Sequence, residues 1–91
     1  MRKYVIEREI PKVGSFNSTQ LCDAAKTSNA ALAKLSPDIQ WLHSYVTAEK
    51  TFCIYMAKDQ AVIKRHAELS GFPANKITEV TGMIGPLTAT N

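Results

Sequence analysis

Two kinds of hydrophobic pattern divide this 91-residue chain into six predicted elements. Four segments are rich in β-branched and aromatic residues, which favours strands over residues 3–10, 39–46, 51–57 and 77–84. Pro11 ends the first of these segments. Only residues 47–50 separate the second from the third, so these two strands are predicted to form a hairpin.

Two helices are predicted between the strands. The first begins at Asn17, with Gln20 three residues later in the capping-box position, and stops before Pro37. Its inward face recurs at steps of four and three residues: Leu21, Ala25, Ser28, Leu32 and Leu35. The second helix is capped by Asp59 and ends at Gly71. Its inward face holds Val62, His66 and Leu69.

The order strand, helix, strand, strand, helix, strand predicts an α+β fold, the ferredoxin-like βαββαβ sandwich. Residues 1–91 then form a single ferredoxin-like domain with a short polar tail at residues 86–91. Both helices cover one face of a four-stranded antiparallel sheet, and the other face is left open. Because monomers seldom expose an aromatic-rich face of this size, we predict a homodimer packed sheet to sheet.

The register of the hairpin decides which side chains share a face of the sheet. We favour the register that pairs Val46 with Thr51 and Ser44 with Cys53, because it gathers the large side chains on the open face. A loop of odd length would exchange the two faces. The predicted dimer interface is Trp41, Tyr45, Phe52, Ile54 and Met56, with His43 beside them. The side chains predicted to face the helices are Leu42, Ser44, Val46, Cys53 and Tyr55.

Composition and charge exclude several classes of protein. The net charge is +3 and the basic residues are spread along the chain, so no basic stripe suggests nucleic-acid binding. Apolar runs are too short for a membrane-spanning helix, which needs about 20 apolar residues. Charged residues near the N-terminus argue against a signal peptide, so we expect a cytoplasmic protein in which Cys22 and Cys53 stay free thiols.

His66 is the most informative candidate for chemistry, because its place in the second helix points it at the sheet. Cys53 and Tyr55 are predicted to face it, and Glu7 joins them if it lies on the same side of its strand. Imidazole, thiolate and carboxylate suit a transition metal such as nickel, zinc or cobalt. His43 is a second candidate ligand. The alternatives are a hydrogen-bonded core histidine, a general acid or base, and a pocket that includes Tyr55 and Ser44.

A resemblance to one family follows from the order and spacing of several short motifs. They are Tyr4-Val5-Ile6-Glu7-Arg8, Ser44-Tyr45-Val46, Cys53-Ile54-Tyr55 and Arg65-His66-Ala67. The chain resembles, over nearly its whole length, a family of small single-domain proteins that includes a streptomycete nickel-binding protein. That resemblance implies a ferredoxin-like fold, a homodimer and nickel binding.

Three classes of function therefore remain open from the sequence. The first is a small dimeric metal-binding protein, with nickel as the metal implied by the resemblance. The second is a dimeric α+β barrel protein, either a binding protein or a cofactor-free enzyme, with a pocket between sheet and helices. The third is a structural or interaction module with a filled core. We favour the first of these from the sequence.

Overall fold

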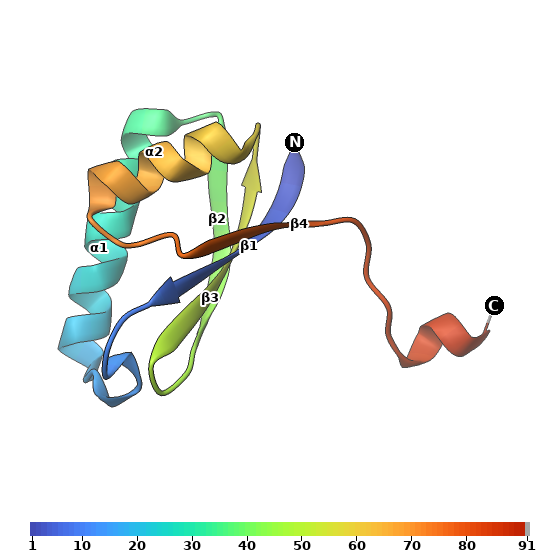
Figure 1. Cartoon of the computed structure of the whole chain (residues 1–91), viewed down its shortest axis with the longest axis horizontal. Coiled ribbons are helices and arrows are strands. Elements are labelled where there is room, and N and C mark those ends of the chain that lie inside the picture. The colour runs from blue at the N-terminus through green and yellow to red at the C-terminus, as the bar shows by residue number, and fades with distance from the viewer. Residues whose placement is uncertain (91) are drawn as a thin grey trace.

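Two helices packed on one four-stranded sheet make up the computed structural model, which describes residues 1–90 (Figure 1). The elements are β1 (Arg2–Glu9), α1 (Ser18–Leu35), β2 (Ile39–Val46), β3 (Lys50–Ala57), α2 (Gln60–Ser70) and β4 (Lys76–Val80), with short 3-10 turns at Val13–Ser15 and Pro86–Thr90. The strand order is β2-β3-β1-β4, and all neighbouring strands are antiparallel. Both helices lie on the same side of the sheet, which confirms the ferredoxin-like α+β fold.

The predicted helix signals are confirmed at both helices. The Asn17 side chain accepts from the Gln20 amide, and the Gln20 side chain accepts from the Asn17 amide, so the capping box is complete. Asp59 Oδ1 accepts from the Val62 amide at 3.0 Å. Gly71 ends α2 with a φ of 80°, a left-handed conformation that glycine adopts without steric cost.

The last strand is shorter than predicted, because β4 ends at Val80 and not at residue 84. Val80 pairs with Lys3 near the start of β1, so the residues beyond Val80 have no strand left to pair with. Residues 81–90 extend away from the sheet as an arm that carries exposed Met83, Ile84 and Leu87 (Figure 1).

The predicted hairpin register is confirmed, since Val46 pairs with Thr51 and Ser44 with Cys53. A β-bulge at Leu42 then shifts the alternation, so that His43 pairs with Ile54 but Trp41 pairs with Tyr55. The prediction for Trp41 was therefore wrong, because its side chain joins the helix-facing side and its Nε1–H donates to Ser44 Oγ at 2.9 Å. Leu42 is the unpaired bulge residue and is 40% exposed, although it was predicted to face the helices.

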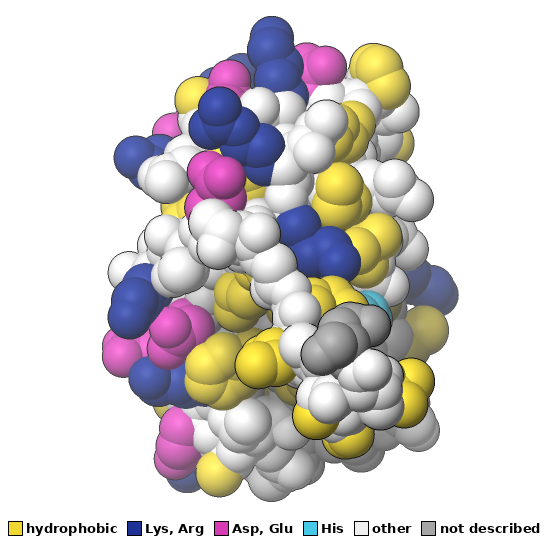
Figure 2. All heavy atoms as spheres, turned by 90° about the vertical axis from the view of Figure 1, so that its right-hand side faces the viewer, with side chains coloured by type: hydrophobic (Ala, Val, Ile, Leu, Met, Phe, Trp, Pro, Cys, Tyr) yellow, Lys and Arg dark blue, Asp and Glu magenta, His cyan; other side chains and the backbone are white. Residues whose placement is uncertain are grey.

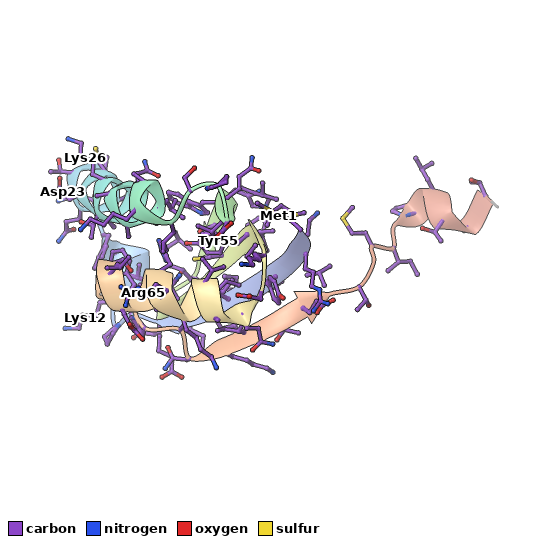
Figure 3. All side chains as sticks on the ribbon, turned by 90° about the horizontal axis from the view of Figure 1, so that it is seen from above. Met1, Lys12, Asp23, Lys26, Tyr55 and Arg65 are labelled. Atoms are coloured by element: carbon purple, nitrogen blue, oxygen red, sulfur yellow. The ribbon has the colours of Figure 1, made fainter. Side chains whose placement is uncertain are left out.

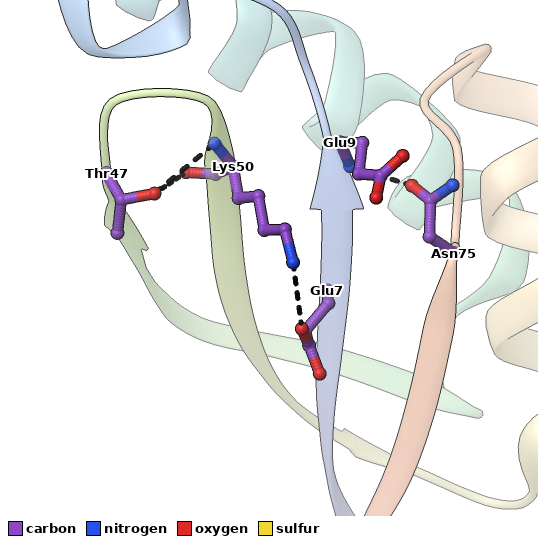
Figure 4. A network of polar contacts seen from close by, with 5 residues as sticks. All are labelled: Glu7, Glu9, Thr47, Lys50 and Asn75. Atoms are coloured by element: carbon purple, nitrogen blue, oxygen red, sulfur yellow. Dashed lines mark hydrogen bonds and ion pairs between the residues drawn. The ribbon is translucent and has the colours of Figure 1, made fainter.

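The open face of the sheet keeps the other apolar side chains predicted for it. These are Tyr45, Phe52, Ile54 and Met56, and Val5 of β1 lies beside Ile54. Figure 2 shows this side of the molecule, with hydrophobic side chains gathered across its middle. The ion pair between Lys50 and Glu7, at 3.6 Å, borders the apolar region on the hairpin side (Figure 4). Polar contacts also fix the hairpin turn, where Thr47 Oγ1 donates to the Lys50 carbonyl at 2.8 Å.

The hydrophobic core occupies one end of the space between sheet and helices. Its buried members are Tyr4, Ile6, Ile39, Cys53, Tyr55, Ala57 and Ile63, and Leu32 and Leu35 of the last turns of α1 pack against them. At the other end, the turn at Val13–Ser15 closes onto the β2–β3 loop. Gly14 makes this approach possible, since a Cβ there would lie 2.7 Å from Ala48 Cα. Neither α1 nor α2 is long and apolar enough to cross a membrane.

Candidate functional site

A cavity of about 270 Å³ lies between the sheet and the first half of α1. We call it the helix–sheet cavity. Its apolar wall is formed by Ile10, Val13, Phe16, Leu21, Val46 and Phe72. Leu21 and Val46 are 39% and 46% exposed, so they mark the entrance from solvent. The cavity is therefore mostly apolar and open to solvent on one side, as small-molecule sites often are.

The helix–sheet cavity exists because the side chains that face each other across it are small. Ala24, Ala25 and Ser28 of α1 line the cavity from above, and Ser44 and Thr51 line it from the sheet. The larger Leu32 and Leu35 of the same helix fill the corresponding space further along. The larger residues in the C-terminal half of α1 set the distance between this helix and the sheet. The small residues in its N-terminal half therefore leave a gap that no side chain among residues 1–90 fills.

Arg8 closes the inner end of the cavity and is only 2% exposed. Its Nη1 donates to the carbonyl oxygens of Phe72 at 3.3 Å and Pro73 at 2.9 Å. Its Nη2 donates to Tyr55 Oη and His66 Nδ1, each at 3.4 Å. Arg8 therefore ties β1 to β3, α2 and the loop after α2. We call the buried set Arg8, Ser28, Tyr55 and His66 the Arg8 cluster. In Figure 3 Tyr55 lies well inside the molecule.

His66 is neutral within this cluster. A guanidinium group only donates, so His66 Nδ1 accepts from Arg8 and the ring proton is on Nε2. Nε2–H donates to the Ser28 carbonyl at 3.3 Å and lies 3.2 Å from Ser28 Oγ. Burial, and then the positive charge of Arg8, lower the pKa of His66 below its usual value. Burial also raises the pKa of Tyr55, so its phenol stays protonated near neutral pH.

The lowered pKa of His66 predicts that acid destabilises the fold. Below about pH 6.5, the imidazole of His66 becomes protonated in the unfolded chain but stays neutral in the folded chain. The free energy of unfolding should fall with decreasing pH, by up to about 1.4 kcal/mol per pH unit, until the pH reaches the lowered pKa. Urea denaturation between pH 7.5 and 5 measures this slope. His66→Gln should lose the slope, and an unchanged slope in that variant would contradict the prediction.

The structure separates the residues predicted to bind a metal. Cys53 and His66 are buried in the layer between sheet and helices, and Cys53 Sγ lies 3.4 Å from Thr51 Oγ1. Glu7 points to the open face, because its neighbours Ile6 and Arg8 take the helix-facing side of β1. His43 also lies on the open face, with its ring edge-on to Tyr45 at 5.1 Å.

The Arg8 cluster does not fit a transition metal. Within residues 1–90, no three histidine, cysteine, aspartate or glutamate side chains converge as a metal site would require. Arg8 occupies the place beside His66 that Glu7 was predicted to take, and a buried cation repels a metal ion. His66 Nδ1 already accepts from that cation.

Sequence reasoning identified His66, Tyr55 and Ser44 but missed Arg8. The structure places Tyr55 and Ser44 on the cavity wall and His66 in the Arg8 cluster behind it. The signal for Arg8 was present in strand alternation, since it has the same parity as Tyr4 and Ile6. A charged residue at the third position of a buried stripe indicates a partnered interior group.

The fold, the open sheet face and the cavity define a small single-sheet α+β protein of the ferredoxin-like class. Residues 4–80 match the family described as nickel responsive protein SCO4226-like, and the chain belongs to that family. Among solved structures, it is similar to SCO4226 from Streptomyces coelicolor A3(2), with 15% identity and a TM-score of 0.74. The similarity covers 90% of this chain and 99% of that one. A search of curated proteins found no match.

Proposed function

We propose that this protein binds a small, mainly apolar organic molecule in the helix–sheet cavity. The observation that carries the proposal is a mostly apolar cavity of about 270 Å³ that opens to solvent beside Leu21 and Val46 and has Arg8 at its inner end. An apolar cavity of about 150 Å³ already holds a benzene molecule. The helix–sheet cavity therefore has room for a substituted aromatic ring or a branched aliphatic chain of similar size.

Trp41 provides a direct test, because it is the only tryptophan of the chain and lines the cavity. A bromine atom quenches indole fluorescence on contact, so para-bromobenzamide is a neutral probe that reports its own entry. We expect saturable quenching of Trp41 together with heat of binding in calorimetry. Quenching that rises linearly with probe concentration and never saturates would contradict the proposal.

We also propose that the protein is a homodimer joined through its open sheet faces. The support is the apolar surface formed by Tyr45, Phe52, Ile54 and Met56, on the face of the sheet that neither α1 nor α2 covers (Figure 1). Surfaces of this kind usually mark a protein interface. The chain's family and the bare face of its fold are compatible with this arrangement.

A charge placed in the centre of that face should dissociate the dimer. Ile54→Asp would bury an unpaired carboxylate in the interface, at a cost of several kcal/mol. Light scattering coupled to gel filtration should give the mass of one chain for this variant and of two chains for the natural protein. Ala30→Asp, on the exposed side of α1, is the control and should remain dimeric. A dimeric Ile54→Asp protein would place the interface elsewhere.

Nickel binding is a second candidate function, and it is favoured by the chain's family. The Arg8 cluster is unsuited to it, so we propose that nickel is held on the open face, where a homodimer would bring two copies of His43 to one interface, with Glu7 as a further ligand once nickel displaces its ion pair with Lys50. Equilibrium dialysis against nickel should show binding that His43→Ala loses and His66→Ala keeps. If His66→Ala lost nickel binding and His43→Ala kept it, the nickel site would lie between the sheet and the helices and not on the open face.

A further inference from the structure

We propose that the ligand of the helix–sheet cavity is a monocarboxylate whose carboxylate pairs with Arg8. This inference rests on the proposed function, since it assigns the chemical class of the molecule bound in that cavity. It follows from the charge balance at the inner end of the cavity, from the donors that Arg8 presents there, and from the apolar walls around the remaining space.

The charge balance at Arg8 is incomplete within the described chain. Burying a charged side chain costs several kcal/mol unless an opposite charge or strong hydrogen bonds compensate it. The ion pairs found within residues 1–90 are Arg2–Glu79, Lys50–Glu7 and Arg65–Glu68, and all lie on the surface. The groups around Arg8 are two carbonyls, a phenol and a neutral imidazole. The cavity thus ends at a net positive charge.

The donors of Arg8 are only partly engaged. The contacts of Nη2 to Tyr55 and His66 are 3.4 Å long, well beyond the usual 2.9 Å of a good N–H···O bond. Nε–H donates to no group within residues 1–90. Every fully buried side-chain nitrogen or oxygen within residues 1–90 has a hydrogen-bond partner. Because Nε has none, it is not fully buried and can be reached by a ligand. A carboxylate entering the cavity would accept from Nε–H and Nη2–H, the paired geometry that guanidinium groups favour.

The rest of the cavity limits the ligand to one charged group. Its walls beyond Arg8 are mostly apolar and hold no charged side chain among residues 1–90, so a second charge would be buried without a partner. The volume of about 270 Å³ accommodates a ring or branched chain beyond the carboxylate. The ligand class is therefore an aromatic or branched aliphatic monocarboxylic acid.

A matched pair of probes tests this assignment on the natural protein. Para-bromobenzoate and para-bromobenzamide have nearly the same shape and differ in charge, and each is titrated against Trp41 fluorescence near neutral pH. We expect the carboxylate to bind at least tenfold more tightly than the amide. Ala25→Leu, which narrows the cavity, should weaken the binding of both probes at least tenfold.

The outcomes separate the two proposals. Equal affinity of the two probes would overturn the carboxylate assignment and leave the cavity as a neutral ligand site. Saturable binding of neither probe would overturn the proposed function itself. A carboxylate preference that disappears between about 0.05 and about 0.5 M NaCl would place the charge recognition on the surface and overturn the role of Arg8, because buried pairs are screened much less than exposed ones.

Discussion

Replacing Arg8 with methionine should lower the free energy of unfolding by about 3 kcal/mol. The substitution removes the donor for the Pro73 carbonyl at 2.9 Å and for His66 Nδ1. Each buried acceptor left without a donor costs about 1–3 kcal/mol. The flexible, apolar methionine side chain fills much of the vacated space and removes the cost of burying the guanidinium charge, so the net loss is smaller than the sum of the lost hydrogen bonds.

Chemical denaturation followed by Trp41 fluorescence measures this loss. Arg65→Met is the matched control, because Arg65 lies on the exposed side of α2 and pairs with Glu68 at 3.5 Å on the surface. Exposed pairs of this kind contribute about 0–1 kcal/mol, so the control should be nearly as stable as the natural protein. If Arg8→Met were as stable as Arg65→Met, Arg8 would not be the structural link between β1 and the loop after α2.

Ala25→Leu should weaken binding of para-bromobenzamide at least tenfold without lowering stability. Ala25 lines the helix–sheet cavity from α1, so the added side chain takes the space that the probe needs. Filling an existing apolar gap adds buried surface instead of creating strain, and the free energy of unfolding should stay equal or rise slightly. Probe binding therefore weakens while the free energy of unfolding does not fall, a combination that a general loss of structure cannot reproduce.

Ala30→Leu is the control for this substitution. It adds the same side chain to the same helix on the exposed side, away from the cavity. Its binding should match that of the natural protein. If Ala30→Leu and Ala25→Leu weakened binding equally, the probe would not occupy the helix–sheet cavity, and the proposed function would have to be revised.

Local patterns were sufficient to predict the elements and their order. The capping box at Asn17, the cap at Asp59 and the terminal Gly71 are short-range signals, and each acts within one turn of its helix. The hairpin register was also predictable, because it is the one that sorts large from small side chains between the two faces. The end of β4 was not, because strand length depends on how far its partner β1 extends.

The candidate site was predicted only in part, because a shift of one residue along a strand moves a side chain to the other face of the sheet. A single bulge at Leu42 moved Trp41 from the predicted interface into the cavity wall. One step along β1 put Arg8, instead of Glu7, beside His66. Nothing in the local sequence marks a bulge of this kind, and its effect is to reverse the face of every residue that precedes it in the strand.

The sequence by itself determined the α+β class, the order of the elements, the ends of both helices and the placement of His66 toward the sheet. These depend on periodicity and on capping residues that act over a few positions. Tertiary structure alone decided that small residues on α1 meet small residues on the sheet to leave a cavity. It also decided that a buried arginine, with no carboxylate beside it among residues 1–90, stands at the cavity's inner end, because both features arise where distant segments meet.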